Sequence, residues 1–106
     1  MNIPCRLIEE PESYTSAQPG DMWYIDRELD QLSQFYRDNN QHRKPIIVKL
    51  PTGDYFCIDS PCYSQEQGAY GGWTVTGDAP NITVSPSINM VGRWHGFLTG
   101  GVLTSC

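Results

Sequence analysis

The stretch that decides the fold is IIVKLPTGDYFCID, residues 46–59. Two runs of β-branched and aromatic residues, 46–50 and 55–59, flank the four-residue segment PTGD. Proline and glycine in so short a connection favour a tight turn between paired strands. The stretch therefore predicts a β-hairpin.

The segments on either side of this hairpin have the same strand-forming character. Aromatic and β-branched runs separated by turn residues predict more strands. We expect them at 5–10, 21–25, 73–76, 82–85, 93–98 and 102–104. The last four would pair as two further hairpins.

One helix is expected between the strand at 21–25 and the central hairpin. Ile25, Leu29, Leu32 and Tyr36 follow the spacing i, i+4, i+7 and i+11, and Asp26 is placed to cap the first turn. This apolar stripe is one face wide, so it predicts an amphipathic helix that covers a sheet.

Length and charge limit the protein class. A chain of 106 residues has room for one small core, so we expect a single domain over 1–106. The expected fold class is α+β: a small, mostly antiparallel β-sheet built from hairpins with one covering amphipathic helix. With a net charge of −5 and seven scattered Lys and Arg residues, no nucleic acid partner is expected.

No apolar run approaches the roughly 18 residues of a membrane span, and MNIPCRLIEEPE lacks the order of a signal peptide. We therefore expect no membrane partner and a cytoplasmic location. Four cysteines are present, and without an export signal we expect reduced thiols. They are Cys5, Cys57, Cys62 and Cys106.

A candidate catalytic pair lies near the C-terminus, in TVSPSINMVGRWHG. Pro86 is expected to end the strand at 82–85 and to place Ser87 on a turn. His95 lies on the next strand, which could return antiparallel and bring the imidazole within reach of the serine hydroxyl. A serine needs such a base to act as a nucleophile. Gly96 would leave room for a substrate.

The acid that orients the histidine is less well defined. Asp59, at the end of the central hairpin, is the first candidate, and Asp21, Asp54 and Asp78 compete with it. The plainer interpretation stays open, because Ser-Pro-Ser is common in turns and a strand histidine is often structural.

Other chemistries have weaker support. Cys57 with His95 is an alternative nucleophile and base, although a mid-strand cysteine usually packs as an inert group. Cys57-x4-Cys62 has about the spacing of half a zinc knuckle, but a second half is missing, so neither a metal nor a cofactor is assigned.

Aromatic residues near the segment 60–72 suggest a protein or extended peptide partner. They are Tyr63, Tyr70, Trp73 and Trp94.

The order GDMWYI, IIVKLPTGDYFCID, GGWTVTGDAPNITVSPSIN and GRWHGFLTGGVL resembles a family of small phage and prophage proteins of unknown function that are often mislabelled as ammonia monooxygenase. The resemblance runs from Gly20 onward and is most specific over 72–102. It implies a phage-encoded accessory protein in the host cytoplasm.

That family is distantly similar to a serine-protease-like domain of bacterial operons for ubiquitin-like proteins. Pro86-Ser87-Ile88 matches its first motif and Trp94-His95 the position of its second. The resemblance implies a serine hydrolase or peptidase acting on peptide, isopeptide or ester bonds. The alternative is a non-enzymatic phage protein that binds and modulates a host or defence protein.

Overall fold

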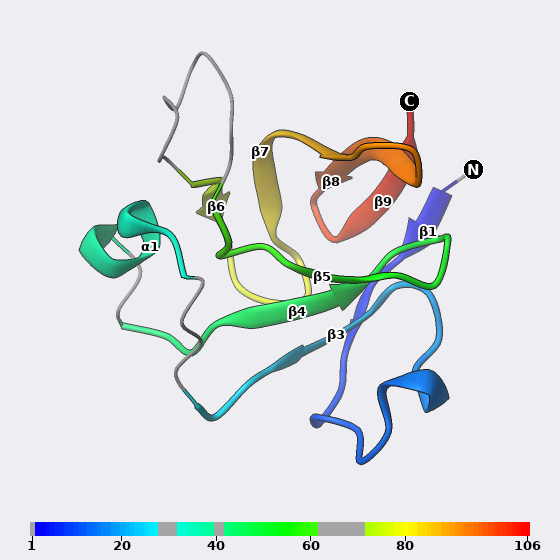
Figure 1. The fold of residues 1–106 in the computed structure, drawn as a ribbon, viewed down its shortest axis with the longest axis horizontal. Coiled ribbons are helices and arrows are strands. Elements are labelled where there is room, and N and C mark those ends of the chain that lie inside the picture. The colour runs from blue at the N-terminus through cyan, green and yellow to red at the C-terminus, as the bar shows by residue number, and fades with distance from the viewer. Residues whose placement is uncertain (1, 28–31, 40–41, 62–71) are drawn as a thin grey trace.

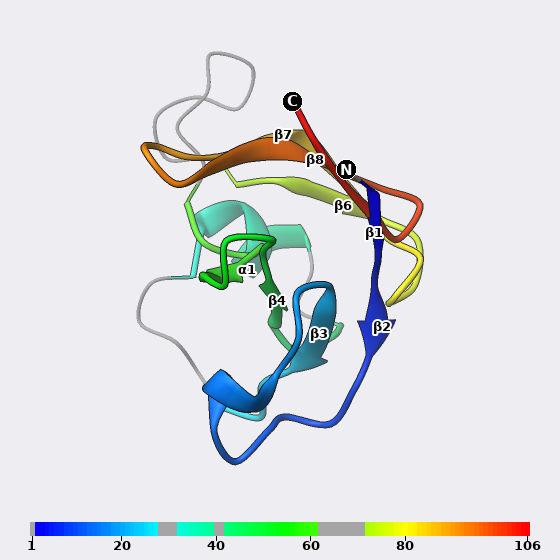
Figure 2. The same ribbon diagram turned by 90° about the vertical axis from the view of Figure 1, so that its right-hand side faces the viewer.

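The computed structural model describes residues 2–27, 32–39, 42–61 and 72–106. In these ranges the protein is mostly β-structure: two sheets, mainly antiparallel, with one short helix and one 3-10 turn, η1 (Tyr14–Ser16). The two sheets form separate layers (Figures 1 and 2). The expected single sheet is therefore corrected to two.

The five-stranded sheet is entirely antiparallel and has the order β1-β9-β8-β7-β6. Its strands are β1 (Asn2–Pro4), β6 (Thr74–Thr76), β7 (Thr83–Met90), β8 (Trp94–Thr99) and β9 (Val102–Ser105). The two expected C-terminal hairpins are thus present as β6–β7 and β8–β9. A third hairpin, β7–β8, joins them.

The four-stranded sheet contains the predicted central hairpin. Its strands are β2 (Arg6–Leu7), β3 (Asp21–Tyr24), β4 (Ile46–Lys49) and β5 (Tyr55–Cys57), in the order β2-β3-β4-β5. Only β2 and β3 are parallel. The Leu50 N–H donates to the Asp54 carbonyl at 2.9 Å, which closes the predicted turn. The hairpin prediction is confirmed.

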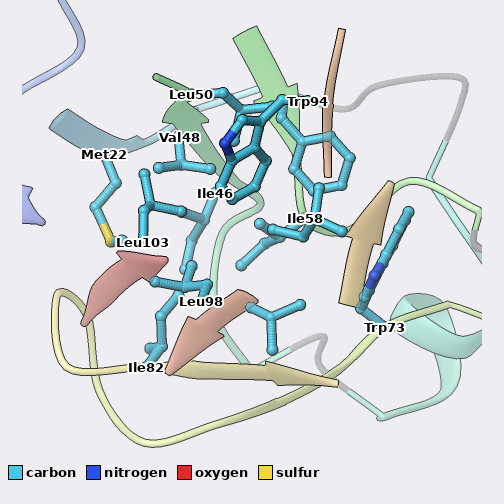
Figure 3. Close-up of a cluster of buried hydrophobic side chains, with 13 residues drawn as sticks. Met22, Ile46, Val48, Leu50, Ile58, Trp73, Ile82, Trp94, Leu98 and Leu103 are labelled. Carbon is cyan, nitrogen blue, oxygen red and sulfur yellow. The ribbon is translucent and has the colours of Figure 1, made fainter. Parts of the chain in front are cut away.

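The main core lies between the two sheets (Figure 3). Inward-facing side chains alternate along β7 and β8 and meet those of β3, β4 and β5. The core members are Met22, Ile46, Val48, Leu50, Phe56, Ile58, Trp73, Ile82, Val84, Ile88, Trp94, Leu98 and Leu103. A smaller cluster of Ala17, Trp23, Ile25 and Ile47 is built from the opposite face of β3 and β4.

The helix is shorter than predicted. It is α1 (Gln34–Asn39), and it begins where the Ser33 hydroxyl accepts the Tyr36 N–H at 3.0 Å. Ile25 packs in the smaller core and Asp26 lies 3.1 Å from Lys44 Nζ, so neither belongs to the helix. Leu29 lies outside the described residues. The helix start near Asp26 was wrong because a stronger cap lies at Ser33 and burial of Ile25 outweighs its helical spacing.

Two strand boundaries also differ from the prediction. The segment at 5–10 forms only β2, while β1 precedes it. The strand at 82–85 continues as β7 to Met90, so Pro86 does not end it and Ser87 lies in a strand. Proline is tolerated there because the pairing with β8 is irregular between Val84 and Ile88. No helix among the described ranges is long and apolar enough to cross a membrane.

Removing the helix cap should weaken the fold measurably. We expect Ser33→Ala to lower the free energy of unfolding by about 1 kcal/mol, since the Tyr36 N–H loses its partner. Ser13→Ala is the control, because Ser13 precedes η1 without a side-chain capping bond and its exposed hydroxyl bonds the Thr15 hydroxyl. Urea denaturation should separate the two variants, and equal losses would contradict this account of the helix start.

Candidate functional site

The pairing of β7 with β8 sets the geometry of the candidate site. Val84 pairs with Leu98 and Ile88 pairs with Gly96, so β7 advances by four residues while β8 advances by two. Three residues of β7, 85–87, thus lie opposite one residue of β8, and this excess of two residues is a bulge. Beyond it the register is regular again, and Asn89 is paired with His95.

The structure brings Ser87 and His95 together. The Ser87 Oγ lies 3.1 Å from the His95 Nε2, which is hydrogen-bonding distance. The direct partner of His95 is Asn89, and Ser87 lies two residues before Asn89 on β7. The contact between Ser87 and His95 is therefore diagonal across the strand pair. A long imidazole can span such a diagonal to a short serine side chain.

The pair lies on the outer face of the five-stranded sheet, the layer that contains β7 and β8 in Figure 2. Along β8 the side chains alternate, with Trp94 buried and His95 exposed, as expected for a strand with one solvated face. The imidazole is therefore open to solvent.

The expected role of Gly96 was wrong. Gly96 faces the core, where a Cβ atom would meet the Trp94 ring and the Thr104 carbonyl. The Trp94 Nε1–H donates to Ser105 Oγ at 3.0 Å, which fixes the indole over this glycine. Gly96 therefore makes room for Trp94, not for a substrate.

Both backbones at the site are held by neighbouring groups. The Trp73 Nε1–H donates to the Ser87 carbonyl at 3.4 Å, and the Cys106 N–H donates to the His95 carbonyl at 3.0 Å. Trp73 packs edge-on against Phe56, with ring centroids 5.0 Å apart. Contacts with core residues therefore help to hold the backbones that carry Ser87 and His95.

The predicted aromatic surface is corrected in part. Trp73 and Trp94 are core residues, each 8% exposed, so neither offers a ring to a partner. Figure 3 shows both indoles among the buried side chains. Tyr63 and Tyr70 lie outside the described residues.

Asp59 is committed elsewhere. Its carboxylate is 1% exposed and accepts two hydrogen bonds from Arg43, at 2.8 and 2.9 Å, and one from the Ile46 N–H at 3.0 Å. These bonds compensate the buried charge. The structure thus gives Asp59 a structural role between β4 and the segment before it, and does not bring it to His95.

The competing carboxylates, Asp21, Asp54 and Asp78, likewise show no link to His95 in the described part of the chain. The hydrogen bond from Arg6, 2.6 Å, holds the pKa of Asp21 below its usual range, and the Arg93 hydrogen bond does the same for the pKa of Asp54. Asp78 lines a separate cavity of about 260 Å³. None of these three has a hydrogen bond to the imidazole in the described structure.

The cysteine and metal alternatives receive no support. Burial raises the pKa of the Cys57 thiol to about 11, so it is protonated and a poor nucleophile at neutral pH. Burial likewise raises the pKa of Cys5 to about 11. Cys62 lies outside the described residues, and within the described ranges no three His, Cys, Asp or Glu side chains form a possible metal site.

The chain matches no protein-family model, no curated protein and no solved structure.

The buried ion pair should matter for stability. Arg43→Ala leaves the Asp59 carboxylate buried without its charged partner, and we expect a loss of about 3–5 kcal/mol in the free energy of unfolding. Arg93→Ala, which breaks the exposed pair with Asp54, should cost at most about 1 kcal/mol. Urea titrations of both variants measure this difference. Similar, small losses would show that Asp59 does not depend on Arg43.

Proposed function

We propose that this chain is a serine hydrolase of the dyad type, with Ser87 as the nucleophile and His95 as the general base. The observation that carries the proposal is the 3.1 Å contact between Ser87 Oγ and His95 Nε2. A hydroxyl in hydrogen-bonding distance of an imidazole nitrogen is the arrangement that activates serine.

The chemistry requires a neutral imidazole with a free lone pair on Nε2. Nε2 takes the hydroxyl proton as Ser87 Oγ attacks the carbonyl carbon of an ester, amide or isopeptide. The protonated imidazole then gives that proton to the leaving oxygen or nitrogen as its bond to the carbonyl carbon breaks. Water, activated in the same way, hydrolyses the resulting acyl-serine ester and regenerates the dyad.

Two further features support the proposal. The bulge in β7, residues 85–87, has no register partners on β8, so the ladder is interrupted beside the dyad. The resemblance of Pro86-Ser87-Ile88 and Trp94-His95 to a serine-protease-like domain selects the same two side chains. It also makes a phage-encoded accessory protein the proposed biological setting.

The surroundings of the dyad favour a peptide or protein substrate. His95 and Ser87 occupy an open sheet face, and Phe97, two residues along β8 on the same face, is 45% exposed. An extended chain could lie across this face with one apolar side chain against the Phe97 ring.

The nucleophile can be tested with a fluorophosphonate probe. Ser87→Ala and His95→Ala should each reduce labelling at least about a hundredfold, because either change removes half of the activated pair. Ser85→Ala is the control, since Ser85 lies on the same strand and, in the described structure, is not hydrogen-bonded to the imidazole. Urea denaturation verifies that the variants fold. Full labelling of Ser87→Ala would contradict the proposal.

The role of Phe97 can be tested with esters of different acyl length. Phe97→Ala should raise KM for a p-nitrophenyl ester of a medium-length acyl chain by several-fold and leave the acetate ester unchanged, since only the longer chain reaches the ring. Tyr55→Ala is the control, an aromatic of similar exposure (41%) on the other sheet. Equal effects on both esters would contradict this role.

A second candidate function is a non-enzymatic protein that binds a host or defence protein. The observation that favours it is the exposure of Phe97 and of Val91, which is 85% exposed at the β7–β8 turn. The net charge of −5 would favour a basic surface on the partner. Two results together would favour this function: the fluorophosphonate does not label the wild-type protein, and a stoichiometric partner still binds the Ser87→Ala variant.

A further inference from the structure

A third polar side chain stands beside the dyad. Asn89 on β7 is the register partner of His95 on β8, and both side chains are exposed on the outer face of the sheet. Directly opposite residues in an antiparallel pair have Cβ atoms about 4.5–5.5 Å apart. The Asn89 amide is therefore within reach of the imidazole.

The two side chains have complementary unused groups. The His95 Nε2 faces Ser87, and its Nδ1 has no hydrogen-bond partner among the described residues. The Asn89 amide likewise makes no hydrogen bond there. An amide oxygen is a good acceptor for an imidazole N–H, and the amide group also carries donors.

The state of Nδ1 decides whether Nε2 can act as a base. A neutral imidazole carries one proton, so Nε2 has a free lone pair only when that proton is on Nδ1. Among the described residues no carboxylate is hydrogen-bonded to the His95 ring, and Asp59, Asp21 and Asp54 are paired with arginines. Another acceptor is needed to hold the proton on Nδ1.

We propose that Asn89 is the positioning residue of the dyad: a rotation of its exposed side chain brings the amide oxygen to the Nδ1–H of His95, and this hydrogen bond keeps the Nε2 lone pair directed at Ser87. The catalytic consequence rests on the proposed hydrolase function, whereas the hydrogen bond itself does not.

The other neighbour of His95 is less suited to this role. Cys106 lies across from His95 on the β9 side, where its N–H bonds the His95 carbonyl. Its thiol is a weak acceptor. Of the two described residues directly across from His95, Asn89 on β7 and Cys106 on the β9 side, Asn89 offers the stronger acceptor to Nδ1.

The tautomer of His95 can be measured by ¹⁵N NMR of the imidazole at an alkaline pH where the ring is neutral. We expect the wild type to carry the proton mainly on Nδ1, and Asn89→Ala to shift the population toward the Nε2–H form. Asn89→Asp should keep the Nδ1–H form, because a carboxylate also accepts. Asn2→Ala, which removes an exposed asparagine on β1 of the same sheet, should change nothing.

The rate of fluorophosphonate labelling separates this inference from the proposed function. Asn89→Ala should slow labelling at least about tenfold, with rescue by Asn89→Asp. If Asn89→Ala shifts the tautomer but the probe does not label the wild-type protein, the proposed hydrolase function is overturned and the positioning role of Asn89 stands. A wild-type tautomer ratio in Asn89→Ala would overturn the positioning role, whatever the labelling rate.

Discussion

The candidate site depends on one interruption in the hydrogen-bonded ladder between β7 and β8. Pro86 has no backbone N–H, and it lies where two extra residues on β7 suspend the pairing with β8. Had the register continued unbroken from Val84 and Leu98, Ser87 would have been the direct partner of His95. The bulge instead places Asn89 opposite His95 and Ser87 on the diagonal, so that the imidazole is flanked by a hydroxyl and an amide.

The rest of the fold keeps this strand pair in place. Ile88 and Trp94 point into the core between the sheets, while Asn89 and His95 point out, so burial of one face orients the other. The Asp59–Arg43 pair serves a different purpose. It ties the segment that follows β5 to Arg43 and to the start of β4, and so it helps to shape the four-stranded sheet beneath the site.

Features set by neighbouring residues could be predicted from the sequence, whereas features set by strand register could not. The hairpin at 46–59 follows from a local turn signal, and the antiparallel return of His95 toward Ser87 follows from the strand spacing. The predicted start of the helix was wrong because Ile25 is buried with Trp23 in the smaller core and is not part of a helix. Asn89 was missed because only the two-residue shift in β7 makes it a neighbour of His95, and the sequence contains no signal for the size of that shift.

The central claim is that Ser87 is an activated nucleophile, and the most direct measurement is the site of covalent modification. The intact wild-type protein would be treated with a fluorophosphonate, digested and mapped by tandem mass spectrometry. The account predicts a single phosphonyl adduct on the Ser87 hydroxyl, with the neighbouring Ser85 unmodified, although both serines lie on β7. An adduct on Ser85, adducts spread over exposed serines and tyrosines, or no adduct at all would contradict it.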